Sequence, residues 1–186
     1  MDNDATFLPA LVALPLVAAA LPPLFKARTR LDPSLIAGAS TAVTLLAVLS
    51  QRAEVFAGGM LVADWAWMPG LGLHLAFRMD GLGFLFAFLI TVIGLLVVVY
   101  ARYYLSPEDA TGRFYSFLLL FMGAMLGIAL SENLLQLLVF WEMTSLASFL
   151  LIGYWRDESA ARQGARLALL VTGAGGMALL LSLIHI

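Results

Sequence analysis

Six long apolar stretches, each long enough to cross a bilayer as a helix, dominate the hydropathy pattern of the chain. A helix needs roughly 20 apolar residues to cross the hydrocarbon layer. The pattern predicts helices at about residues 5–25, 34–50, 81–104, 113–131, 133–153 and 162–183. Four prolines in the first stretch should kink or fray that helix, which neighbouring helices in a membrane can tolerate.

Residues 51–80 show a different pattern. The segment LVADWAWMPGLGLHLAFRM alternates large apolar residues with small or polar ones, and the pair Pro69-Gly70 interrupts it as a turn would. The alternation predicts a β-hairpin between the second and third helices, with strands at about 61–68 and 71–79, packed over the helix ends. We interpret His74, on the second strand, as a surface histidine without a special role.

Asp80 directly precedes the predicted helix 81–104. An aspartate at this position can cap a helix, because its carboxylate accepts hydrogen bonds from the first free backbone N–H groups. Capping is the simpler interpretation of Asp80, and an ion pair with Arg78 at the membrane rim is the alternative.

The composition places the chain among integral membrane proteins. It is 62% hydrophobic and 12% charged, with a mean hydropathy of +0.98, whereas soluble domains have about 25% charged residues. A net charge of -2 argues against nucleic acid as a partner. The chain has no cysteine and only two histidines, far apart in sequence, so no cofactor or metal site is expected. The fold class predicted is an all-α membrane protein with one hairpin.

The basic residues predict the orientation in the membrane. Eight of the ten fall on one side of the predicted spans and two on the other. The two groups are Lys26, Arg28, Arg30, Arg102, Arg113, Arg156, Arg162 and Arg166 against Arg52 and Arg78. The positive-inside rule then predicts a multi-pass protein with its N-terminus and hairpin outside.

Glu142 is the most unusual residue of the pattern, because it lies in the middle of an apolar span, QLLVFWEMTSLASFLLIGYW. At 1.5 Å per residue it is about 15 Å from either end of the helix, too deep for its short side chain to reach water. Ser145 and Ser148 follow on a neighbouring side of the helix. Glu142 is either a protonated structural contact or a group that gains and loses protons along an ion path, and intramembrane ionisable residues favour the second interpretation.

The last predicted span contains GARLALLVTGAGGMALL, with Gly164, Gly173, Gly175 and Gly176. Glycines let a neighbouring backbone approach closely in membrane bundles. Helix packing is therefore the first interpretation of these four glycines, and a flexible hinge for ion passage is the alternative.

Three stretches together resemble a known family. FRMDGLGFLFAFLITVIGLLVVVYARYYL, NLLQLLVFWEMTSLASFLLIGYW and ALLVTGAGGMALL are similar, in order and spacing, to the N-terminal region of antiporter-like membrane subunits. These are the large A subunits of the multisubunit Na+/H+ (Mrp-type) antiporters and the related proton-pumping subunit of respiratory complex I. The resemblance covers about residues 60–181, while the first 55 residues match mainly in character.

The resemblance implies a role for Glu142, since the glutamate of the family's FWE stretch is a central proton-translocation residue that works with a lysine on a later helix. That lysine would lie beyond the end of this chain, and Lys26 in a predicted inner loop is not a candidate. Ser145, Ser148, Gly173 and Gly176 are supporting candidates.

The family also implies a transported monovalent cation, Na+ in the first instance, partner subunits of a hetero-oligomeric complex, and a bacterial plasma membrane. Complex I subunits tend to have an arginine and an aspartate in a TRVGD-like string, where this chain has Gly173 and Gly176. This difference favours the antiporter branch. An inactive structural fragment and a proton-pumping component of complex I are the alternatives.

The resemblance divides the chain into four parts: residues 1–50 with two helices, 51–80 with the hairpin, 81–112 with the third helix and an inner loop, and 113–186 as the start of the proton-translocating core. Family members continue for many more helices. The ending SLIHI at 182–186 does not resemble the family, so a truncated chain is expected and His185 is given no role.

Overall fold

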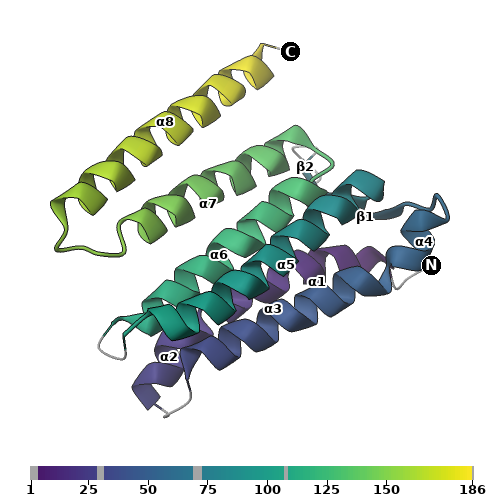
Figure 1. Cartoon of the computed structure of the whole chain (residues 1–186). Helices are drawn as coiled ribbons and strands as arrows, with labels where there is room; N and C mark the ends of the chain where they lie inside the picture. The colour runs from purple at the N-terminus through teal and green to yellow at the C-terminus, as the bar shows by residue number, and fades with distance from the viewer. Residues whose placement is uncertain (1–3, 29–31, 69–72, 107–108, 186) are drawn as a thin grey trace.

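The computed structural model shows long helices packed side by side, with a two-stranded hairpin across one end (Figure 1). It describes residues 4–28, 32–68, 73–106 and 109–185. The elements are α1 (Asp4–Ala18), α2 (Leu21–Arg28), α3 (Pro33–Ser50), α4 (Arg52–Phe56), β1 (Leu61–Met68), β2 (Leu73–Met79), α5 (Gly81–Tyr104), α6 (Thr111–Leu130), α7 (Leu134–Ile152) and α8 (Ser159–Ile184).

Six helical segments in this described part of the chain are long and apolar enough to cross a membrane, which confirms the predicted count. The first segment, Thr6–Leu24, is divided between α1 and α2 at Ala19 and Ala20, just before the Pro22-Pro23 pair. The Ser116 hydroxyl of α6 donates a hydrogen bond to the carbonyl oxygen of Ala19 at this break. The predicted proline distortion is therefore a true interruption, and a neighbouring helix satisfies a freed backbone group.

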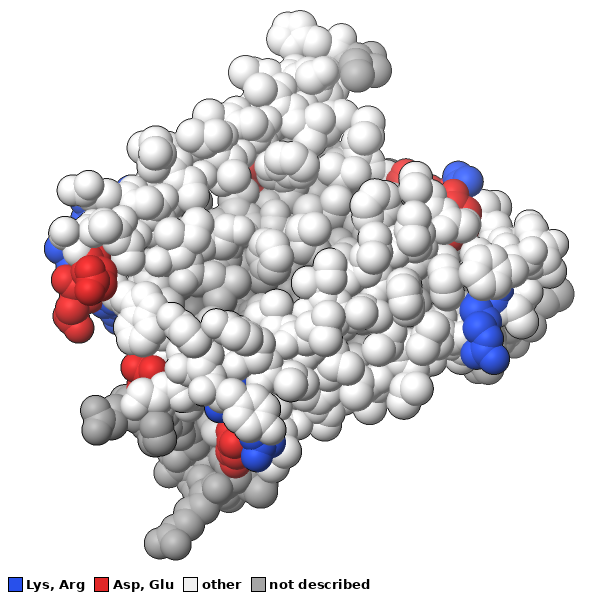
Figure 2. All heavy atoms as spheres, viewed as in Figure 1, with Lys and Arg blue, Asp and Glu red and all other residues white. Residues whose placement is uncertain are grey.

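Charged side chains gather at the two ends of the face shown in Figure 2, and the broad band between them is white except for one small acidic patch. Large apolar side chains are exposed along the helices in this band, as a lipid-facing surface requires. In the first four spans 33–44% of the residues are buried, whereas the share is 17% in α7 and only 6% in α8. In Figure 1, α8 lies at the edge of the molecule and packs against α7.

Three helices start with a side-chain cap that the sequence places there. Asp32 accepts a hydrogen bond from the Ser34 backbone N–H at 2.9 Å, with Pro33 in the first helical position of α3. Asn133 caps α7 in the same way.

Asp80 caps α5 by accepting hydrogen bonds from the backbone N–H groups of Leu82 and Gly83. Its other oxygen lies 3.1 Å from the Arg78 guanidinium, so both interpretations of Asp80 hold at once. The hydrogen bond from Gly83 is the largest influence on this carboxyl group and lowers the pKa of Asp80 below its ordinary value.

The two strands form the predicted antiparallel hairpin. Leu61 pairs with Met79 and Trp65 with Leu75, and the register shifts between Ala66 and Met68. Side chains alternate between faces: those of Leu61, Ala63, Phe77 and Met79 are buried in the main core with residues of α1, α5 and α6. The second strand begins at Leu73, and the predicted strand residues 71 and 72 lie outside the described part.

One element in this region was not predicted. Residues 52–56 form the short helix α4 directly after α3, where only a hairpin region was expected. Its sequence, RAEVF, contains good helix formers and continues an existing helix, so one more turn needs no new nucleation.

Candidate functional site

Glu142 lies near the middle of α7, eight residues after Leu134 and ten before Ile152. At 1.5 Å per residue these intervals correspond to about 12 and 15 Å. The side chain of Glu142 is half-buried. A carboxyl group at this depth costs a few kcal/mol to insert in its charged form, so its surroundings must favour a neutral form or provide a partner.

Gly176 of α8 lies directly against the carboxyl group of Glu142. A Cβ atom placed on Gly176 would overlap a carboxyl oxygen of Glu142, and it would lie 3.5 Å from the ring of Trp141. The absence of a side chain at this one position therefore leaves the space that the carboxyl group occupies. The indole N–H of Trp141 on α7 donates a hydrogen bond to the carbonyl oxygen of Thr172 on α8, at 3.5 Å.

The two serines of the predicted polar arc form no hydrogen bond with the carboxyl group among the described residues. Ser145 is buried, and its hydroxyl donates to the carbonyl oxygen of Trp141 within α7, at 3.2 Å. Ser148, half-buried, lies further along the same helix. Within the described part of the chain, no hydrogen bond or ion pair joins Glu142 to another side chain.

The four glycines of α8 differ in their surroundings. A Cβ atom on Gly164 would make an ordinary contact with Ile152 of α7, whereas one on Gly173 or Gly175 would meet nothing within 4 Å. Gly176 and Gly164 therefore face α7, and the other two do not face a described residue.

A second glycine contact, which was not predicted, holds α7 close to α6. The Phe140 ring packs onto the backbone of Gly127 in α6, where a Cβ atom would overlap the ring. Phe140 precedes Glu142 by two residues, so α7 is held close to α6 beside the glutamate and contacts α8 at the glutamate itself. The sequence signal was available, since small residues at helix interfaces permit close approach in membranes.

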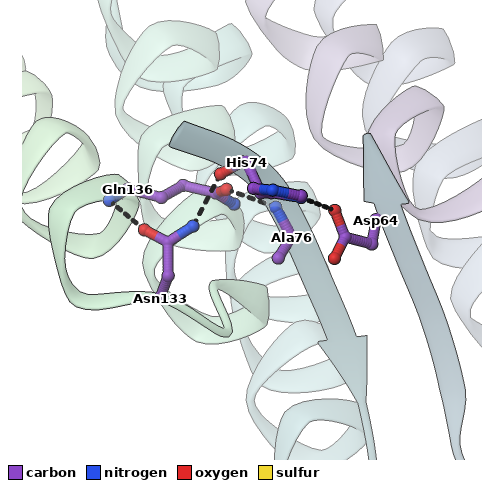
Figure 3. Close-up of polar contacts among 5 residues, drawn as sticks. All are labelled: Asp64, His74, Ala76, Asn133 and Gln136. Carbon is purple, nitrogen blue, oxygen red and sulfur yellow. Dashed lines mark hydrogen bonds and ion pairs between the residues drawn. The ribbon is translucent and has the colours of Figure 1, made fainter. Parts of the chain in front are cut away.

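The start of α7 is bonded to the hairpin (Figure 3). Gln136 accepts a hydrogen bond from the Ala76 backbone N–H at 2.8 Å, and Asn133 donates one to the His74 carbonyl oxygen at 2.7 Å. The Asn133 side chain also accepts from the Gln136 backbone N–H, so it caps α7 and contacts β2 at once. These three bonds, with that from the Glu132 backbone N–H to the Ala76 carbonyl oxygen, form what we call the β2–α7 clasp.

His74 has a neighbour that the sequence did not reveal. Its Nδ1 lies 2.7 Å from a carboxylate oxygen of Asp64 on β1, and both side chains are about half exposed. The pair is diagonal across the hairpin, because Asp64 pairs with Ala76 in the register. His74 is thus a surface residue in a cross-strand contact.

The possible metal ligands are distributed over the described residues. Among residues 4–28, 32–68, 73–106 and 109–185, no group of three or more His, Cys, Asp or Glu side chains gathers at one place. The chemistry available at Glu142 is that of one carboxyl group packed against the backbone of the neighbouring helix, and such a group can take up a proton, release it or accept a hydrogen bond.

Comparison with known proteins gives two matching families. Residues 65–115 match the family described as NADH-ubiquinone oxidoreductase (complex I), chain 5 N-terminus, and residues 131–186 match NADH:quinone oxidoreductase/Mrp antiporter, TM. The A/B subunit of a probable K+/H+ antiporter of Rhizobium meliloti (strain 1021) is 51% identical over 153 residues, which are 82% of this chain and 15% of that protein. The chain belongs to the family of antiporter-like A subunits.

Other relatives agree with this family. The A1 subunit of the Na+/H+ antiporter of Staphylococcus haemolyticus (strain JCSC1435) is 46% identical over 138 residues, 74% of this chain and 17% of that protein. A chain in the structure of the Mrp complex from Dietzia sp. DQ12-45-1b has a TM-score of 0.80 and 33% identity, with 93% of this chain and 18% of that chain covered. This member of the A-subunit family thus spans about a sixth of the length of these relatives.

The same fold occurs in a more distant respiratory complex. A chain of the membrane-bound sulfane sulfur reductase, an archaeal respiratory membrane complex, has a TM-score of 0.78 at 20% identity, which shows likeness of fold alone. Together with the six apolar helices, the family establishes a multi-pass membrane protein and confirms the resemblance found in the sequence.

Proposed function

We propose that this chain is part of a membrane subunit that exchanges a monovalent cation for protons, with Glu142 as the group that takes up and releases the proton. The observation that carries the proposal is the half-buried carboxyl group at mid-depth of α7, placed against the bare backbone of Gly176. Desolvation favours the protonated form of a carboxyl group and a nearby cation favours the charged form. A cation that comes and goes would therefore switch Glu142 between the two forms.

The partners proposed are the other subunits of a hetero-oligomeric antiporter complex. The relatives from Rhizobium and Staphylococcus are named as subunits, and the Dietzia neighbour belongs to an Mrp complex. One relative is named for K+ and another for Na+, so both ions are candidates for the cation. The activity proposed is secondary transport, without a chemical conversion of a substrate.

A proton-pumping subunit of complex I is the second candidate, because the family that matches residues 65–115 is described by that enzyme. In that case the same glutamate would move protons, but no cation would be exchanged for them. The dependence of proton movement on an added cation therefore distinguishes the two functions.

The experiment that tests the proposal uses a chimera, in which this chain replaces its matching region in the A/B subunit from Rhizobium meliloti and the remaining subunits are native. Proton movement in everted membrane vesicles is followed with a pH-sensitive dye, and Na+ or K+ is then added. We expect the chimera to restore cation-dependent proton exchange in cells that lack the native protein. Restored assembly without any exchange would contradict the proposal, and the ion that elicits exchange identifies the cation.

Orientation in a bacterial plasma membrane is a separate prediction, with the N-terminus and the hairpin outside. The chain has no cysteine, so Met60→Cys and Asp157→Cys each introduce a single thiol. Both positions are exposed: Met60 directly precedes β1, and Asp157 lies in the loop between α7 and α8, at the other end of the helices. In intact cells a membrane-impermeant maleimide should label Met60→Cys at least about tenfold more than Asp157→Cys, because the rule that places basic loops inside puts residue 157 in the cytoplasm. Permeabilised cells, where both should react, are the control, and the reverse order in intact cells would refute this orientation.

A further inference from the structure

A small basic cavity lies where α7 ends and α8 begins, far from the hairpin. It has a volume of about 260 Å³ and lies at the charged end of the two helices. Its lining combines three arginines with an apolar wall: Arg156, Arg162 and Arg166, with Phe117, Phe149, Leu150, Gly153 and Ala165. Glu142 lies about two helical turns deeper along α7, so this cavity is distinct from the candidate site.

The three arginines lie close together where α7 ends and α8 begins. Arg162 and Arg166 are four residues apart on α8, so their like charges are neighbours on one face of the helix, which is unfavourable. Arg162 also donates a hydrogen bond to the Arg156 carbonyl oxygen at 2.6 Å, which holds the loop against the helix. Arg162 lies in the first turn of α8, where the helix dipole disfavours positive charge.

Carboxylates also lie near this loop, without direct ion pairs to the arginines among the described residues. In the described part of the chain, the three ion pairs are formed by His74, Arg78 and Arg102, and none involves the arginines of this cavity. Asp157 and Glu158 line a neighbouring cavity together with Arg156, so carboxylates lie near one of the three arginines. Three guanidinium groups therefore line one cavity at the charged end of the helices, and none of them forms an ion pair among the described residues.

We propose that this cavity binds the phosphate of an anionic phospholipid. Guanidinium groups recognise phosphate oxygens through pairs of hydrogen bonds, and basic pockets between helices at a membrane boundary suit anionic headgroups. The wall of Phe117, Phe149 and Leu150 leads from the arginines to the apolar surface, where the acyl chains of a lipid continue. A free phosphate ion would use the arginines alone, whereas a phospholipid uses both parts of the cavity.

The test compares photoactivatable phosphatidylglycerol with photoactivatable phosphatidylcholine, each with its reactive group near the headgroup. The 186-residue chain is placed in nanodiscs of phosphatidylcholine with a small fraction of either probe, illuminated, and digested with chymotrypsin for mass spectrometry. We expect preferential labelling of the segment around residues 149–166 by phosphatidylglycerol. Each arginine near an anionic lipid contributes about a fivefold preference, so Arg162→Gln/Arg166→Gln should lower labelling about twentyfold to thirtyfold.

The matched control is Arg52→Gln/Arg102→Gln, which removes the same charge away from the cavity and should label like the unmodified chain. Equal labelling by the two probes, or an unchanged signal in Arg162→Gln/Arg166→Gln, would overturn the proposal. Displacement of the lipid probe by excess inorganic phosphate would also overturn it and assign the cavity to a small anion. If circular dichroism shows that the double variant does not fold, the single variants replace it, each with an expected loss of about fivefold.

Discussion

The Glu142→Gln variant of the chimera should lose cation-dependent proton exchange by about a thousandfold and still assemble in the membrane. The amide has the size and hydrogen-bonding capacity of a neutral carboxyl group, so the contact with Gly176 can persist. It cannot ionise, and removal of a positioned proton-transfer group costs about a hundredfold to ten-thousandfold in rate. Glu142→Asp keeps the acid but withdraws it by about 1 Å, so exchange should be reduced by about a hundredfold and remain detectable.

The matched control for this variant is Glu132→Gln, the same chemical change at a position outside the membrane span, just before α7. It should leave exchange within about twofold of the unmodified chimera, because surface charges at this distance are screened. Protein levels in the membrane are measured for all variants by immunoblot. Near-normal exchange by Glu142→Gln at normal protein levels would show that the glutamate is a structural contact and not a proton carrier.

Gly176→Ala should impair exchange nearly as strongly as Glu142→Asp while leaving the fold intact. The added Cβ atom would overlap a carboxyl oxygen of Glu142, which is the far end of a flexible side chain. The carboxyl group can therefore rotate away at little cost in stability, and α7 and α8 stay packed. A displacement of about 1 Å of a reacting group can cost about a hundredfold in rate, so we expect a loss of that size.

Gly175→Ala and Gly173→Ala are the controls for this prediction, on the same helix and with the same added methyl group. A Cβ atom at either position meets nothing within 4 Å, so exchange should be unchanged. Both should slightly stabilise the helix, since alanine is favoured over glycine by about 0.5–1 kcal/mol within helices. Initial exchange rates in vesicles are compared among the three variants at equal protein levels. Equal rates for Gly176→Ala and Gly175→Ala would rule out a role in proton transfer for the contact between Gly176 and Glu142.

The elements of this fold could be predicted from local sequence because each has a local cause. Long apolar stretches define the spans, strict alternation defines the hairpin, and Asp80 supplies the hydrogen bonds that start α5. The helix α4 was missed because a five-residue extension of an existing helix leaves almost no pattern of its own. Family membership was also recognised from sequence, because the strings around Glu142 and the α8 glycines are specific.

The geometry around Glu142 could not be predicted in the same way. Both Gly173 and Gly176 were candidates, but three residues correspond to about 300° of helical rotation, so their directions differ by about 60°. Only the packing of α8 on α7 decides that Gly176 meets the carboxyl group and Gly173 does not. The hydrogen bonds of Gln136 with Ala76 and of Asn133 with His74 likewise join residues about 60 positions apart, and local patterns do not encode such pairings. The role of Glu142 in proton transfer stays a prediction.

The β2–α7 clasp makes the hairpin and the start of α7 one unit for protein engineering. Because the Ala76 N–H depends on the Gln136 side chain, and the cap of α7 depends on an Asn133 that is also bonded to β2, neither segment carries all of its own hydrogen-bond partners. A recombination point between residues 79 and 131 would combine a hairpin from one parent with an α7 from another. Each buried polar group left unpaired at the junction would cost about 1–3 kcal/mol. Crossover points for exchanging segments between family members therefore belong before residue 61 or after residue 136.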